Sequence, residues 1–156
     1  MLRVKGARGF TLVELMIVLA LLAIVATIAV PNFVQFIRNN QVQAKADEVK
    51  SFLQYARGQA VTTRRSYEVT TDSSWEVKPV DGDVERRLEF NTAQAQARAS
   101  SGTLTFAPNG SVTNAATITV CRDTDASNGY LIQVQRSGMV RMQPRGVDVP
   151  NNCGVE

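Results

Sequence analysis

The sequence predicts an α+β fold in which a long N-terminal helix packs its second half on a mainly antiparallel β-sheet. Three patterns in the 156 residues lead to this prediction. Residues 15–30 are almost all apolar, apolar residues then recur at helical spacing to about residue 63, and from Tyr67 onward they alternate as in half-buried strands. We therefore expect four segments, with bounds 1–9, 10–30, 31–63 and 64–156.

A short basic leader opens the chain and precedes a span that is long enough to cross a membrane. Its charged residues are Arg3, Lys5 and Arg8, and residues 12–30 would form about 28 Å of helix, close to the roughly 30 Å of hydrocarbon in a bilayer. Basic residues keep the leader in the cytoplasm, so the rest of the chain is expected in the periplasm. A secretory signal cleaved near Thr27-Ile28-Ala29 and a plain membrane anchor are the alternatives.

Glu14 is the one acidic residue near the start of this apolar span. It ends the run Gly9-Phe10-Thr11-Leu12-Val13-Glu14. A carboxylate in a membrane helix costs roughly 2.5 to 3.5 kcal/mol, so such residues are usually retained for a partner or a function. Glu14 therefore argues against an ordinary secretory signal.

Together, these features resemble the type III signal of type IV pilins and pseudopilins. The resemblance implies that a membrane prepilin peptidase cuts between Gly9 and Phe10 and methylates the new N-terminus of Phe10. It also implies that the Glu14 carboxylate pairs with the N-terminal amine of a neighbouring subunit, so that the major pilin and other minor pilins are partners through this helix. Before assembly the subunit would be a single-pass protein of the inner membrane.

The rest of the composition gives no sign of an enzyme, a cofactor or a metal site. Of 17 basic and 14 acidic residues, three basic ones lie in the leader, so the processed chain is formally neutral. Histidine is absent and only two cysteines occur, which removes the usual general base and leaves too few ligands for zinc. Residues 123–129 begin like a calcium loop, but Gly129 stands at the seventh place, so we expect a polar turn.

The two cysteines, Cys121 and Cys153, are expected to form a disulfide, because thiols oxidise in the periplasm. Closing a loop of about 33 residues would contribute on the order of 3.7 kcal/mol in the chain-entropy model. Two free thiols are the alternative.

The predicted helix continues beyond the membrane. Pro31 cannot donate to the carbonyl of Thr27, so a kink or local unwinding is expected there. Beyond it, an apolar stripe favours packing on a sheet within the subunit over a coiled-coil seam, since only about three heptads repeat. The stripe consists of Val42, Ala46, Val49, Leu53, Ala56 and Ala60.

Short alternating segments after the helix predict strands, and Asn109-Gly110 predicts a tight turn. The final strand pair crosses Arg136-Ser137-Gly138. Residues 92–101 are rich in Ala, Gln and Ser and are interpreted as a loop or a weak helix. The expected strands are 67–70, 75–78, 88–90, 104–106, 111–113, 118–121, 130–134 and 139–142.

A second set of motifs lies in this region: a Phe106-x-Pro108-x-Gly110 turn, Val120-Cys121, and a strand pair around Ser137-Gly138. They resemble the minor pilins and pseudopilins of the GspH and FimT/FimU type. The resemblance implies a minor pilin that helps prime a type IV pilus and sits at its tip on the cell surface. The proline in residues 29–33 favours the pilus, and a minor pseudopilin of a type II secretion system is the alternative.

DNA capture is a further alternative, because some FimT-type minor pilins bind DNA through a Gly-Arg-x-Arg motif. Here the corresponding residues are Gly138-Met139-Val140-Arg141, so the first arginine is a methionine. Arg136, Arg141 and Arg145 lie within ten residues without an acid, which suits phosphate contacts. Such a cluster also fits a solvated strand edge that resists pairing with other sheets.

Overall fold

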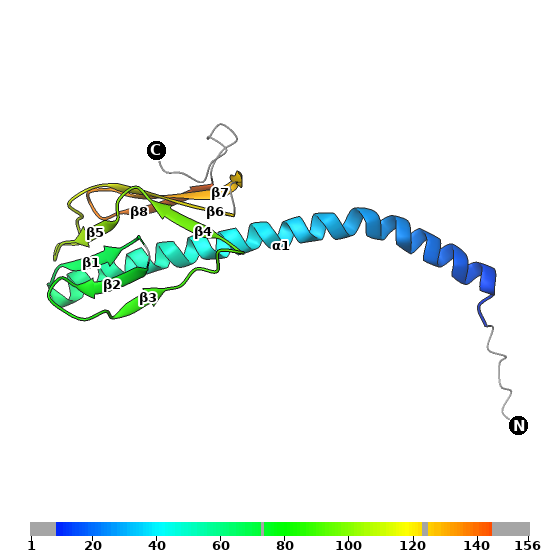
Figure 1. Ribbon diagram of the computed structural model, residues 1–156, viewed down its shortest axis with the longest axis horizontal. Coiled ribbons are helices and arrows are strands. Elements are labelled where there is room, and N and C mark those ends of the chain that lie inside the picture. The colour runs from blue at the N-terminus through cyan, green and yellow to red at the C-terminus, as the bar shows by residue number, and fades with distance from the viewer. Residues whose placement is uncertain (1–8, 73, 123–124, 145–156) are drawn as a thin grey trace, which may run out of the picture. The chain divides into compact units, whose positions relative to one another are not determined.

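The structure is a computed structural model that describes residues 9–72, 74–122 and 125–144. The chain divides into two compact units, Met1–Ile37 and Arg38–Glu156. The helix α1 (Leu12–Thr63) contributes residues to both, and all described strands belong to the second unit (Figure 1). The α+β fold class is confirmed.

Local sequence explains where α1 begins and ends. Thr11 caps the N-terminus, because its hydroxyl oxygen accepts a hydrogen bond from the Glu14 N–H at 3.2 Å. At the other end, Arg64 has a φ of 55°, in the left-handed region that commonly ends helices. The helix thus ends at Thr63, as predicted, and begins two residues after the expected Phe10.

Pro31 lies inside α1, and the helix continues through it. Two side chains near it bond to backbone carbonyls: the Thr27 hydroxyl donates to the Ile24 oxygen at 2.7 Å, and the Asn32 amide donates to the Ile28 oxygen at 3.0 Å. Pro31 therefore does not end the helix, and the kink stays a prediction.

The strands form two four-stranded antiparallel sheets, where the sequence predicted one sheet. The first has the order β3-β2-β1-β5, and the second has the order β4-β6-β7-β8. The first consists of β1 (Tyr67–Thr70), β2 (Trp75–Pro79), β3 (Arg86–Leu88) and β5 (Thr103–Phe106). The second consists of β4 (Gln96–Ala99), β6 (Ala116–Arg122), β7 (Asp125–Val134) and β8 (Val140–Pro144).

The chain passes between the sheets three times, after β3, after β4 and after β5, and the hydrogen bonds at the second crossing are clear. Ser100 donates its N–H to the Thr117 carbonyl beside β4, whereas the Gly102 carbonyl accepts from the Thr71 N–H at the end of β1. The two bonds, 2.8 and 2.9 Å long, attach neighbouring residues to different sheets. A Cβ at Gly102 would lie 2.5 Å from an Asp72 carboxylate oxygen, so this corner suits glycine.

Four sequence predictions about the strands need correction. Residues 92–101 contain β4, because pairing with β6 overrides their weak strand propensity. Residues 111–113 form only an isolated bridge, between Val112 and Phe106. The strand expected at 88–90 is β3, which lies two residues earlier. The turn expected at 123–129 is wrong from residue 125 onward, since β7 begins at Asp125 and pairs there with Arg122, and residues 123–124 lie outside the described residues.

One hydrophobic core joins the second half of α1 to both sheets. The predicted stripe is buried as expected, and Phe52, which lies beside it, is fully buried as well. The Phe52 and Trp75 rings lie 6.4 Å apart between centroids, and the Trp75 and Phe90 rings 5.4 Å apart in an edge-on arrangement. These aromatic contacts connect α1, β2 and the residues after β3.

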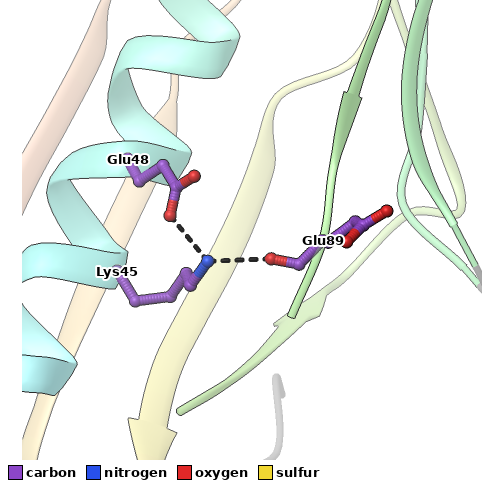
Figure 2. A network of polar contacts seen from close by, with 3 residues as sticks. All are labelled: Lys45, Glu48 and Glu89. Atoms are coloured by element: carbon purple, nitrogen blue, oxygen red, sulfur yellow. Dashed lines mark hydrogen bonds and ion pairs between the residues drawn. The ribbon is translucent and has the colours of Figure 1, made fainter. Parts of the chain in front are cut away.

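Lys45 attaches the chain after β3 to α1. Its Nζ donates to Glu48 Oε2 at 2.6 Å and to the Glu89 backbone oxygen at 2.8 Å (Figure 2). The ammonium also lies 5.1 Å from the centre of the Phe90 ring. Since the Glu48 side chain is exposed, this ion pair contributes little stability, and its effect is to hold the segment around Glu89 near the helix.

Candidate functional site

The described part of the first unit has no buried side chain. Each residue from Phe10 to Ile37 is exposed, and Glu14 is the only charged one among them. Over this stretch α1 is long and apolar enough to cross a membrane. Such a surface is stabilised only when lipid or other apolar helices cover it.

Glu14 lies in the first turn of α1, where Thr11 caps the helix, a role of Thr11 that the sequence analysis missed. The Glu14 N–H bonds to the Thr11 hydroxyl, and the Leu15 N–H donates to the Thr11 carbonyl at 3.1 Å. Thr11-x-x-Glu14 has the spacing of a capping box, so the start of the helix could have been predicted from the sequence. Among the described residues, none forms a hydrogen bond or an ion pair with the Glu14 carboxylate.

Gly9 and Phe10 precede the helix and are exposed. The Phe10 side chain is 79% exposed, and nothing lies within 4 Å of the position a Cβ would take on Gly9. The peptide bond between them is therefore in non-helical chain that an enzyme could reach. Cleavage there, and methylation of Phe10, stay predictions.

Cys121 is fully buried in β6, and Cys153 lies outside the described residues. Strand register relates Cys121 to the end of β8. Pro144 in β8 is opposite Tyr130 in β7, and Tyr130 is opposite Val120 in β6. The chain thus leaves β8 at the end of the sheet where Cys121 lies, which is compatible with the disulfide; the pairing stays a prediction.

Of the residues considered for DNA contact, Arg136 lies in the turn between β7 and β8 and Arg141 lies in β8. Arg136 and Arg141 are exposed, and Arg145 lies outside the described residues. The Arg141 Nε lies 3.3 Å from the Met139 sulfur. Gly138 is buried with a φ of 76°, and a Cβ there would overlap the Gly110 carbonyl oxygen. Packing therefore requires this glycine whether or not DNA binds.

Arg57 of α1 holds that turn in position, a role the sequence analysis also missed. Its Nε donates to the Gly110 carbonyl at 3.0 Å, and its Nη2 donates to the Ser137 carbonyl at 3.3 Å. The Val112 N–H donates to the Arg136 carbonyl at 2.9 Å and ties the same two turns together. The two turns were predictable from their glycines, but only the folded chain brings them to Arg57.

A cavity of about 560 Å³ lies beside the end of α1. Its apolar wall includes Pro79, Val80 and Pro108, and two arginines that follow α1 line it as well. No sequence motif predicted this cavity, because its lining comes from three segments that are separate in the sequence. The lining residues are Arg64, Arg65, Ser66, Pro79, Val80, Asp81 and Pro108.

Tyr67 in β1 donates a hydrogen bond to the Glu85 carboxylate. Burial raises the pKa of the Tyr67 hydroxyl above its usual 10.0, and the 2.8 Å hydrogen bond that it donates to Glu85 raises that pKa further. Within residues 9–72, 74–122 and 125–144, no group of three or more His, Cys, Asp or Glu side chains is placed to hold a metal ion.

Two protein-family models match the chain. The family described as "Type II transport protein GspH" matches residues 45–138, which is more than half of the chain. The "Prokaryotic N-terminal methylation motif" matches residues 4–30. The second match includes Gly9, Phe10 and Glu14.

The chain is also similar to curated pilins over 30% of its length. It is 52% identical over 46 residues to the type IV major pilin protein PilA of Myxococcus xanthus, which covers 30% of this chain and 19% of that protein. It is 43% identical over 47 residues to a fimbrial protein of Pseudomonas aeruginosa, which covers 30% of each chain. The matches thus span less than a third of either relative.

Among solved structures, the type IV minor pilin FimU of Pseudomonas aeruginosa has a TM-score of 0.62 at 23% identity, covering 76% of this chain and 99% of that one. The minor pseudopilin EpsH of the Vibrio cholerae type 2 secretion system has a TM-score of 0.52 at 12% identity, covering 67% and 97%. The likeness at these identities concerns the fold.

Proposed function

Because the chain belongs to the GspH family of type II transport proteins and carries the N-terminal methylation motif, we propose that it is a minor pilin that primes assembly of a type IV pilus. The family consists of structural subunits. In this proposal the processed subunit moves from the inner membrane into a small complex at the filament tip, where it connects other minor pilins to the major pilin.

The observation that carries this proposal is Glu14, the single charge on an exposed apolar helix segment. In lipid, apolar helices gain nothing from the hydrophobic effect on meeting each other, so a polar contact has a large share in deciding how they associate. An unpaired carboxylate at this depth is costly, and a positive N-terminus on a neighbouring subunit removes that cost.

Cleavage and assembly are coupled in this mechanism. Removing residues 1–9 takes three cationic side chains from the N-terminus and leaves a single amine at Phe10. That amine is four residues from Glu14, so pairing with a neighbour's carboxylate staggers two parallel helices by a fixed amount. The pair would therefore set the axial register, while the apolar side chains from Phe10 to Ile37 supply the contact area.

The identity to PilA and to the fimbrial protein supports a pilus as the destination, as does the greater similarity to FimU than to EpsH. A minor pseudopilin of a type II secretion system is the second candidate, favoured by the family description and by the EpsH fold. The two candidates share the Glu14 mechanism and differ in the filament that is primed.

Deletion of the gene distinguishes the two candidates. For the pilus we expect far fewer surface filaments at unchanged levels of major pilin, restored by the intact gene, and antibody labelling at filament ends. Normal piliation together with loss of a secreted protein would instead support the pseudopilin.

DNA binding through Arg136, Arg141 and Arg145 is a third candidate, supported by the exposure of Arg136 and Arg141 on the β7–β8 hairpin. A gel mobility-shift assay on the full-length protein at low salt tests it. No retardation, or retardation unchanged in the triple alanine variant, would exclude it. Arg98→Ala, which removes an exposed charge from β4, is the matched control.

A further inference from the structure

The cavity beside the end of α1 combines cations with an apolar wall, and nothing in the proposed function uses it. Three segments meet there: residues 64–66 after α1, residues 79–81 at the end of β2, and Pro108 after β5. Its volume of about 560 Å³ is within the usual range of roughly 300 to 1,000 Å³ for ligand sites.

Backbone hydrogen bonds hold the walls of this cavity together. The Val80 N–H donates to the Ser66 carbonyl at 3.0 Å and joins the first two segments directly. The Gly82 N–H donates to the Pro79 carbonyl at 3.1 Å and closes the turn, where a Cβ on Gly82 would lie 2.5 Å from the Pro79 ring. A site with walls fixed in this way binds without paying for loop ordering.

The charges at the cavity favour a carboxylate. Arg64 and Arg65 line it, and neither has a hydrogen bond or an ion pair among the described residues. Guanidinium groups bind carboxylates through paired hydrogen bonds. Asp81 is the one acidic side chain in the lining, and it can accept a backbone N–H from the same ligand.

Because part of the wall is apolar, the ligand should carry an aliphatic side chain beside its carboxylate, and an acidic peptide has both groups. Val80 is 47% exposed and is one of four exposed large apolar side chains in the described part of the second unit, with Val61, Val84 and Met139. Beside Pro79 and Pro108 it offers a surface for an aliphatic side chain. A nucleic acid is disfavoured, because the cavity has only two cationic side chains and its lining also holds the acidic Asp81, which repels successive phosphates.

We propose that this cavity binds an acidic segment of a neighbouring subunit, in which a carboxylate meets Arg64 and Arg65 and an adjacent aliphatic side chain packs on Val80 and the prolines. The choice of a subunit as the source rests on the proposed function. The carboxylate and aliphatic preference of the cavity is independent of that function, so peptide binding is measured separately from pilus assembly.

The test uses the full-length protein in detergent and two probes, acetyl-Leu-Glu-Leu-amide and acetyl-Leu-Gln-Leu-amide, followed by ligand-observed NMR. We expect the Glu peptide to bind about tenfold or more tightly than the Gln peptide, and the Arg64→Ala/Arg65→Ala variant to lose a similar factor. Val80→Glu, which adds a carboxylate to the cavity, should abolish binding. Arg98→Ala is the charge-matched control, and buried Trp75 fluorescence reports that each variant is folded.

Equal affinity for the two peptides, or unchanged affinity in both cavity variants, would overturn the proposal. So would tighter binding of inorganic phosphate or of a thymidine oligonucleotide at the same arginines, which would mark a general anion site or a nucleic-acid site. Failure of the proposed function would give a different result. The protein would then be absent from filaments but would still bind the Glu peptide.

Discussion

In the first unit, large apolar side chains such as Leu15, Ile17 and Phe33 are more than half exposed, whereas in the second unit Phe52 and Phe106 are fully buried. A single helix carries both patterns. The second unit satisfies its apolar surface within the chain, and the first can do so only with lipid or with other subunits. Substitutions in the two units should therefore fail in different ways, one in assembly and the other in folding.

Blocking the cleavage site should have the largest effect and leave the second unit folded. With Gly9→Leu, we expect the leader to remain attached, because a bulky side chain replaces the glycine at the expected scissile bond. Incorporation into filaments should fall to background. Intact mass of the membrane-extracted protein measures cleavage, and Val18→Ala in the same exposed segment is the control. A processed Gly9→Leu protein that enters filaments normally would contradict the comparison.

Removing a core side chain should have the reverse effect. Phe52→Ala is expected to cost roughly 3 to 5 kcal/mol of unfolding free energy, as large-to-small core changes do, while membrane insertion and leader cleavage proceed. Trp75 is the only tryptophan and is buried beside Phe52, so its fluorescence follows denaturant unfolding in detergent. A loss below about 1 kcal/mol would mean that the two halves of α1 differ less than their burial indicates.

Arg57→Ala should give an intermediate loss, confined to the second unit. The change leaves the Gly110 and Ser137 carbonyls without their guanidinium donor, and we expect about 1.5 to 3 kcal/mol of destabilisation. The same Trp75 unfolding experiment applies. Arg98→Ala removes an exposed charge of the same kind and should change stability by less than about 0.5 kcal/mol; an equal loss in both variants would refute a specific role for Arg57.

The smallest effect is a pH dependence. The pKa of Tyr67 is raised, so above pH 10 the unfolded chain loses this proton while the folded chain keeps it. The contribution of Tyr67 to the free energy of unfolding is fully present below pH 10. Above pH 10 it should fall by up to about 1.4 kcal/mol per pH unit, until the pH reaches the pKa of Tyr67 in the folded protein. Tyr67→Phe should flatten this part of the profile in alkaline unfolding measurements. An unchanged slope would assign the alkaline loss to other groups.

Sequence reasoning succeeded where local pattern decides the structure. The end of α1 at Thr63 follows from the last apolar residue of the stripe and the polar run after it, and β1 and β2 follow from strict alternation around Val69 and Val77. In the first unit the same reasoning singled out Glu14, because a charge in an apolar run is visible without any tertiary information.

Sequence reasoning failed where contacts between distant segments determine the structure. The division into two sheets depends on pairing between strands far apart in the sequence, such as β1 with β5 and β4 with β6. Neither the contacts of Arg57 nor the cavity beside Arg64 has a local signature. The capping role of Thr11 does have a local signature, the capping-box spacing of Thr11 and Glu14.

The central claim is that the Glu14 carboxylate meets another subunit's N-terminus, and Glu14→Val tests it most directly. The measurement is the amount of this protein in sheared, purified filaments relative to its amount in the membrane, by quantitative immunoblot, with Val18→Ala as the control. The account predicts normal membrane levels, normal Trp75 unfolding and at least about a tenfold loss of incorporation, in keeping with a contact that offsets a few kcal/mol. Incorporation of Glu14→Val at the level of the unchanged protein would contradict it.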